Sequence, residues 1–106
     1  MPKYLVKASF SPQGATGILK EGGTSRRETI GKLVADVGGS MEAFYFAFGE
    51  TDVFTIFDLP DNVTATALAL AVGSSGAVGV ETVVLVTPEE VDQAIKKQVS
   101  FRAPGA

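Results

Sequence analysis

Apolar and polar side chains alternate along four segments of the chain. Successive side chains of a β-strand point to opposite faces of the sheet, so this alternation predicts one strand in each segment. The four predicted strands cover residues 4–10, 41–48, 52–58 and 80–86. Residues 49–51 separate the second strand from the third by a turn of hairpin length, which favours a β-hairpin.

Two long segments between these strands have the spacing of helices. The first carries apolar side chains at positions i, i+3, i+4 and i+7, which places them on one face of an amphipathic helix. This stripe consists of Ile30, Leu33, Val34 and Val37. Gly38 marks the expected end of that helix. A second helix, rich in Ala and Leu, is expected over residues 63–72, and a short helical stretch over residues 12–19.

A last helix is predicted near the end of the chain. Thr87 can cap it, Pro88 suits its first position, and Glu90 stands where a capping box needs a carboxylate. The apolar stripe of this helix consists of Val91, Ile95 and Val99. Such a stripe needs a surface to pack on, and a partner subunit can provide one. Residues 101–106 are expected to form a loose tail.

The predicted elements follow the order strand, helix, strand, strand, helix, strand, with an additional helix at the end. This order matches the ferredoxin-like α+β fold, in which a four-stranded antiparallel sheet carries both main helices on one face. No internal repeat or linker divides the 106 residues. A single domain over residues 1–106 is therefore expected, with its core over about residues 3–98.

Both faces of the predicted sheet are apolar. A sheet with one face in water should alternate cleanly with polar residues, but three strands carry bulky apolar side chains on both candidate faces. An exposed apolar surface of that size normally marks an interface. We therefore predict a homodimer, or a higher homo-oligomer, that packs sheet against sheet. Lys7, Ser9 and Thr55 interrupt the second face, which predicts a polar spot within the interface.

Composition and charge argue against several classes of function. The chain has 9 Lys and Arg against 12 Asp and Glu, so we expect no nucleic-acid partner. It has no Cys and no His, which excludes thiol nucleophiles, imidazole bases and the usual zinc ligands. No cofactor, metal site or catalytic residue is predicted. No membrane partner is expected either, because the apolar runs are shorter than the ~20 residues that span a bilayer. The sequence shows no signal-peptide pattern, so the expected location is the cytoplasm.

Two candidate ligand-binding residues lie on or beside the predicted hairpin. Tyr45 offers either a hydroxyl to a ligand or an aromatic ring to an interface, with its polar end in water. Asp52 either binds a ligand or accepts hydrogen bonds from the N–H groups of the turn. The sequence leaves both alternatives open.

Three charged residues complete the candidate set. Arg26 lies near the start of a helix, where a positive charge opposes the helix dipole, so it is expected to face a carboxylate or an anionic ligand. Asp52 and Glu81 are its candidate partners within the chain. Lys7 needs a partner if it lies in the dimer interface, unless its long side chain carries the ammonium group to the rim.

Several short motifs together resemble the GYD domain family, small bacterial proteins whose role is largely undefined. The resemblance runs from about Tyr4 to Glu90. It rests on Ser11-Pro12-Gln13-Gly14, Ser25-Arg26-Arg27-Glu28, Val37-Gly38-Gly39, Phe44-Tyr45, Gly49-Glu50-Thr51-Asp52, Leu59-Pro60-Asp61 and Glu81-Thr82. It implies a dimeric α+β barrel and no defined activity. The family pattern Gly-x-Tyr-Asp has Thr51 at its tyrosine position here, so any role of that tyrosine would be lost.

The function expected from these observations is that of a non-catalytic homo-oligomer. It would bind a small apolar or weakly anionic molecule between sheet and helices, because such pockets combine apolar walls with a few polar groups. One alternative is a cofactor-free oxygenase or isomerase on the same architecture, with Tyr45, Asp52 and either Lys7 or Arg26 moving protons. The other is a structural module that assembles through its last helix. The sequence leaves the question of catalysis open and favours a non-catalytic role.

Overall fold

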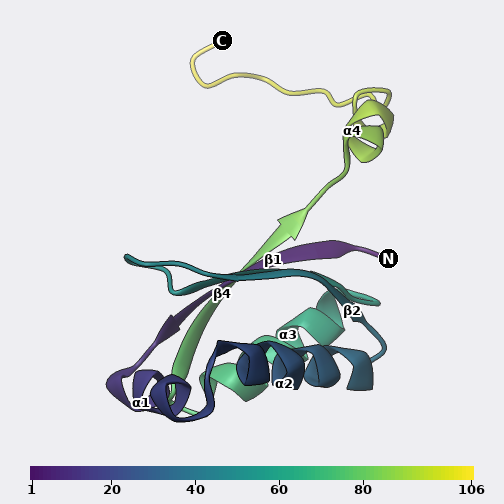
Figure 1. Ribbon diagram of the computed structural model, residues 1–106. Coiled ribbons are helices and arrows are strands. Elements are labelled where there is room, and N and C mark those ends of the chain that lie inside the picture. Colours follow the sequence, from purple (N-terminus) through teal and green to yellow (C-terminus); the bar gives the residue numbers. More distant parts are fainter.

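The computed structural model describes all 106 residues and confirms the ferredoxin-like α+β fold. The elements are β1 (Lys3–Phe10), α1 (Pro12–Glu21), α2 (Gly23–Asp36), β2 (Ser40–Phe46), β3 (Val53–Asp58), α3 (Asn62–Gly73), β4 (Val78–Leu85) and α4 (Pro88–Ala94). The four strands form one antiparallel sheet in the order β2-β3-β1-β4. Helices α1, α2 and α3 lie on one face of the sheet, and α4 lies on the other side, away from the body (Figure 1).

The register of the strands assigns each side chain to a face. Tyr4 and Ala8 of β1 are buried on the face that the helices cover. Lys7, which lies between them in the alternation, is opposite Phe54 on β3 and Glu81 on β4. These three residues therefore belong to the uncovered face, which we call the open face.

Helices α1, α3 and α4 each begin at a residue whose side chain caps the first turn. Asp61 precedes α3, and its carboxylate accepts hydrogen bonds from the backbone N–H and the hydroxyl of Thr64, both at 2.8 Å. These two hydrogen bonds lower the pKa of Asp61 below its ordinary value. None of the helices combines the length and the apolarity that crossing a bilayer requires.

The buried core consists of two separate clusters on the helix-covered face. The larger cluster contains Tyr4, Val34, Phe57, Leu59, Ala65 and Leu68. The smaller cluster contains Ala8, Val53 and Val78. The Tyr4 hydroxyl donates a hydrogen bond to the side-chain oxygen of Asn62, so its polar end is satisfied at the start of α3.

A β-bulge changes the face of one predicted residue. The pairing of β2 with β3 shifts between Met41 and Ala43, so that Met41 is opposite Phe57 while Ala43 is opposite Ile56. Met41 therefore packs against the larger core cluster. Strict alternation over residues 41–48 would place Met41 on the same face as Ala43 and Tyr45, but the extra residue of the bulge reverses the alternation.

Thr55 also lies on the opposite face of the sheet from the one predicted. It is buried on the helix-covered side, where its hydroxyl donates a 2.7 Å hydrogen bond to the carbonyl oxygen of Ala43. Thr55 thus satisfies a backbone acceptor next to the bulge and does not interrupt the open face. On the open face, β1 and β4 carry the polar side chains of Lys7, Ser9 and Glu81. At one end of that face, Lys3 forms ion pairs with Glu42 and Asp58.

The last helix is shorter than its apolar stripe suggests. Thr87 and Glu90 form the predicted capping box, with hydrogen bonds of 3.1 Å and 2.9 Å. The helix ends at Ala94, so the expectation that Val99 lies on it was wrong. Residues 86–106, which we call the C-terminal arm, project from the end of β4 (Figure 1).

Candidate ligand-binding cleft

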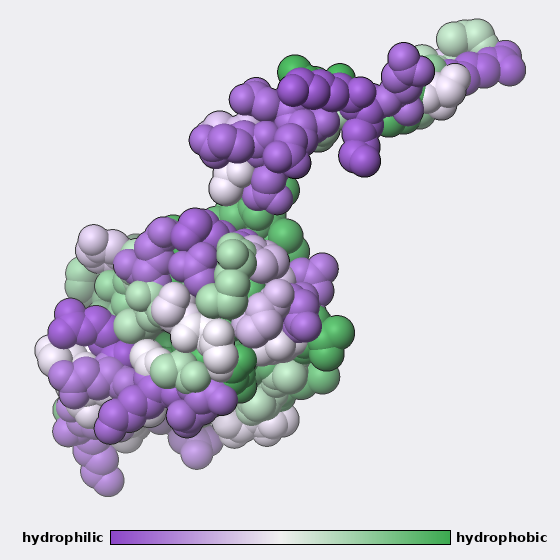
Figure 2. Space-filling view, turned by 90° about the vertical axis from the view of Figure 1, so that its right-hand side faces the viewer, coloured by the Kyte–Doolittle hydropathy of each residue, from purple (hydrophilic) through white to green (hydrophobic).

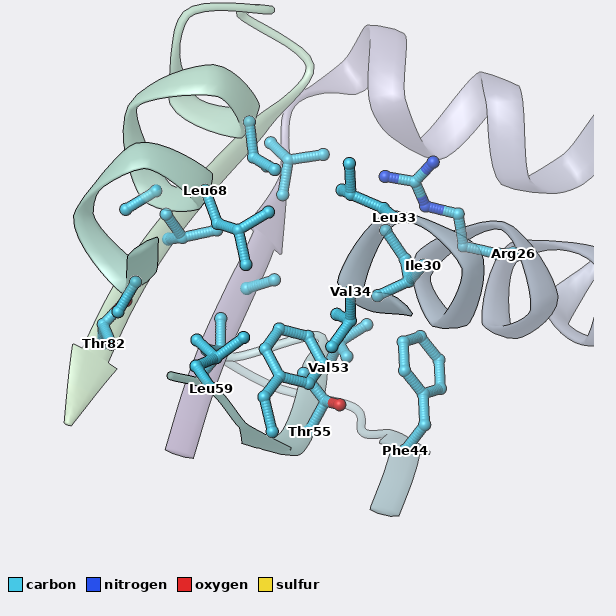
Figure 3. Close-up of a pocket in the computed structure, with 18 of the residues that line it drawn as sticks. Arg26, Ile30, Leu33, Val34, Phe44, Val53, Thr55, Leu59, Leu68 and Thr82 are labelled. Carbon is cyan, nitrogen blue, oxygen red and sulfur yellow. The ribbon is translucent and has the colours of Figure 1, made fainter. Parts of the chain in front are cut away.

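The two long helices cover the two edges of the sheet and leave its centre partly uncovered. Helix α2 packs over β2, and α3 packs over β4. The central strands β1 and β3 therefore form the floor of a cleft, and α2 and α3 form its walls (Figure 3).

The cleft is narrow: a water-sized sphere can occupy about 60 Å³ of it. Pockets that hold drug-sized ligands measure roughly 300–1,000 Å³, so a ligand here would have to be slender or α2 and α3 would have to move apart. Sixteen of its nineteen lining residues are hydrophobic. They are Val6, Ala8, Phe10, Ile30, Leu33, Val34, Phe44, Val53, Phe57, Leu59, Ala65, Leu68, Ala69, Val72, Val78 and Val80. This surface favours an apolar ligand.

Only three lining residues carry a polar side chain: Arg26, Thr55 and Thr82. The hydroxyl of Thr55 is already bonded to the carbonyl oxygen of Ala43. Figure 3 shows Arg26 on α2 at one side of the cleft and Thr82 on β4 at the other. A ligand in the cleft would therefore meet one cation and one hydroxyl on largely apolar walls.

Arg26 is the only charged residue of the cleft, and no carboxylate of the chain pairs with it. It lies in the first turns of α2, where the cap residue Gly22 makes no side-chain hydrogen bond and the first turn contains no acidic residue. A cation there opposes the helix dipole. The structure does not bring Arg26 to either of its candidate partners. Its side chain lines the cleft on the helix-covered side, whereas Glu81 lies on the open face. The Asp52 carboxylate accepts a hydrogen bond from the Phe10 N–H.

Two aromatic residues, Phe10 and Phe44, line the cleft near the start of α2, and Phe46 packs against both of them. The ring of Phe46 packs edge-on against Phe44, with centroids 5.4 Å apart, and is tilted against Phe10 at 6.5 Å. A Cβ atom on Gly23, the first residue of α2, would be 3.0 Å from the Phe46 ring. The absence of a side chain at Gly23 thus lets α2 approach these rings, and Arg26 follows one turn later.

Asp52 connects the β2–β3 loop to Phe10 at the end of β1. Its carboxylate accepts a 2.8 Å hydrogen bond from the backbone N–H of Phe10, and its own N–H donates to the carbonyl oxygen of Ala8 at 2.8 Å. The hydroxyl of Ser9 donates to the carbonyl oxygen of Glu50 at 2.9 Å. These three bonds attach the β2–β3 loop to the end of β1, so Asp52 positions Phe10 through the backbone.

The other three predicted site residues lie on the open face. Tyr45, Lys7 and Glu81 occupy one cross-strand row with Phe54. Tyr45 is 71% exposed. The Lys7 ammonium is 3.8 Å from a carboxylate oxygen of Glu81, an exposed pair of the kind that contributes little to stability. The structure thus separates these residues from the cleft.

A second charged group lies at the end of the open face. The ammonium of Lys3 donates to Glu42 at 2.8 Å and to Asp58 at 2.9 Å. The hydrogen bond to Glu42, followed by that to Asp58, raises the pKa of Lys3 above its ordinary value. This group forms a polar rim at the edge of the apolar surface.

Sequence reasoning named Arg26 and expected a ligand between the sheet and the helices, but it missed Thr82 and the apolar residues that line the cleft. One signal for Thr82 was available: it is the one polar side chain between Val80 and Val84 on that face of its strand. The cleft depends on how far apart the two helices pack, which no local pattern encodes.

Comparison with protein families gives one match. The model of the GYD domain matches residues 4–95, most of the chain. The chain belongs to the GYD domain family. Comparison with curated proteins and with solved structures yields no match. In this GYD domain Gly49, Glu50, Thr51 and Asp52 connect β2 to β3, and Asp52 accepts the hydrogen bond from the Phe10 N–H.

Proposed function

We propose that this GYD domain protein is a non-catalytic homodimer that binds a small, mainly apolar molecule with one anionic group. The ligand would occupy the cleft between the sheet and helices α2 and α3. The proposal extends to a cytoplasmic location in a bacterium.

The observation that carries this proposal is an apolar cleft with a single, unpaired cation. Apolar walls supply affinity in proportion to the area they remove from water, about 25 cal/mol per Å². The guanidinium of Arg26 supplies orientation, because it presents several N–H donors in a fixed plane that matches a carboxylate. A ligand with an apolar body and one carboxylate satisfies both features.

The lining also supports a binding role over catalysis. Arginine remains protonated at any physiological pH, and a threonine hydroxyl does not act as a base unless another group activates it. The enzyme alternative would require Tyr45 and Asp52 to act on one substrate. Tyr45 projects from the open face, and the Asp52 carboxylate is engaged with the Phe10 N–H, so the geometry does not favour that alternative.

The homodimer is supported by the open face. Its centre is a continuous apolar surface, made by Leu5, Phe54, Ile56 and Val83. Phe54 and Val83 are exposed, and no element of the same chain covers them. Contiguous apolar surface of this kind is typical of an interface.

Calorimetric titration with sodium octanoate and with 1-octanol tests the binding proposal. The two probes have the same tail and differ in the anionic group. Wild-type protein should bind octanoate, and Arg26→Gln should weaken that binding about 10- to 100-fold, since a hydrogen bond to a charged group contributes roughly 1.5–3 kcal/mol. Octanol affinity should change little in Arg26→Gln.

The neighbouring Arg27 provides a matched control. It is exposed and lies over β2 outside the cleft, so Arg27→Gln removes the same charge without touching the lining. Octanoate affinity should therefore be unchanged in Arg27→Gln. Equal losses in both variants, or no octanoate binding by the wild type, would contradict the proposal.

A further inference from the structure

The C-terminal arm has a helix that its own chain does not support. Helix α4 has seven residues, a complete capping box, Pro88 near its start and two glutamates in its first turn. Isolated helices shorter than about 12–15 residues are marginal in water, even with good local signals. A lasting α4 therefore requires a surface to pack on.

The apolar side chains of the arm have no such surface within the chain. Ile95 is 76% exposed, Val99 82% and Phe101 80%. Figure 2 shows the arm standing clear of the body, with hydrophobic atoms at the narrow neck where the two join. The radius of gyration is 17.0 Å, whereas a compact chain of this length has about 13 Å.

The arm lies on the same side of the sheet as the open face. Helices α1 to α3 are below the sheet in Figure 1, and α4 rises above it from the end of β4. A second molecule docked on the open face would therefore lie next to the arm. The arm thus extends the proposed dimer interface.

The size of the open face supports the same conclusion. Four strands spaced about 4.8 Å apart, with a rise of about 3.3 Å per residue, give a footprint of about 450 Å². A stable interface buries about 800 Å² on each partner. A planar footprint is smaller than the accessible area of the same face, so the sheet supplies a large part of such an interface, and the arm adds further apolar surface beside it.

We infer that the C-terminal arm of each protomer packs its apolar side chains against the second copy of the chain in the homodimer. The inference rests on the proposed homodimer and adds to it an exchanged arm. The occupant is a second copy because each chain has both an uncovered sheet face and an unsupported arm on the same side. In a dimer with twofold symmetry, the same contact forms twice. The sheet face and the arm of each chain are then both covered by the other chain.

Hydrogen exchange of the α4 amides, measured at two protein concentrations, tests this inference. Sedimentation first establishes the concentrations at which the wild type is dimer and monomer. The amides of residues 91–95 should be protected in the dimer and should lose that protection on dilution to monomer. Protection that persists in the monomer would show that the arm packs on its own body, and no protection in the dimer would show that it is free. Either result overturns the inference while the homodimer stands.

A pair of neighbouring substitutions provides a second test. Ile95→Ser should raise the dimer dissociation constant on the order of 100-fold, because each dimer loses two buried apolar side chains. Lys96→Ser, on the adjacent polar position, should leave it unchanged. Equal dissociation constants for Ile95→Ser and the wild type overturn the exchanged arm. A wild type that is monomeric at all concentrations overturns the homodimer and the arm together.

Discussion

Replacing Ile56 by aspartate tests the open face as a dimer interface. Ile56 is opposite Leu5 on β1 and Ala43 on β2, at the centre of that face. It is half-buried in the single chain and points away from both core clusters, so aspartate there can remain hydrated in a monomer. The substitution should therefore act on association far more than on folding.

The expected effect on association is large because each dimer contains the position twice. An apolar side chain loses about 1.5 kcal/mol when its burial is lost, and a carboxylate without a partner costs at least as much again when it leaves water. At about 3 kcal/mol per protomer, the dimer would lose about 6 kcal/mol, which is roughly a 10⁴-fold increase in the dissociation constant. A dimer with micromolar affinity would then be undetectable.

Sedimentation velocity over a range of micromolar concentrations measures this change, and circular dichroism verifies the fold. Val63→Asp is the matched control, because Val63 is exposed on α3, on the helix-covered side of the sheet. This control should dimerise as the wild type does. If the Ile56→Asp protein folds and remains dimeric, the open face is not the interface.

Two further predictions concern stability. Gly39→Ala should destabilise the fold by about 1–3 kcal/mol in urea unfolding, because a Cβ atom there would clash with the carbonyl oxygen of Asp58. The same change at Gly17, which has open space, should stabilise α1 slightly, and an equal loss at both sites would refute the steric reason. The pKa of Asp61 is lowered by the hydrogen bonds from Thr64, so its contribution to stability is present above the ordinary carboxyl pKa of 3.8 and is lost as the pH falls through the lower folded value. In Asp61→Asn, the free energy of unfolding in urea should depend less on pH below about pH 4. An unchanged pH dependence would contradict this role of Asp61.

The fold was predictable where local patterns agreed with the tertiary structure. The alternation of β1, the apolar stripe of α2 and the capping box of α4 each depend on neighbouring residues. The bulge at Met41 was not predictable, because no glycine or proline marks it and only the pairing with β3 reveals it. The end of α4 was not predictable either. The helix ends at Ala94, although the apolar spacing continues to Val99.

The candidate site was predictable only in part. Arg26 was found because an arginine near a helix start opposes the helix dipole, which is a local argument. Tyr45 and Asp52 were grouped because they are close in sequence, but they have different surroundings in the fold. The cleft arises from the separate packing of α2 on β2 and of α3 on β4. Such long-range geometry leaves no signature at Thr82 beyond a polar residue among valines.

Methyl NMR during a titration with octanoate tests the central claim most directly, since it locates the ligand. The methyl groups of Val6, Ile30 and Leu68, which line the cleft, should shift together and saturate at one dissociation constant. Those of Ile56 and Val83 on the open face should not follow that curve. Shifts confined to the open face, or no shifts in the cleft at saturating octanoate, would contradict a ligand-binding cleft between the sheet and its helices.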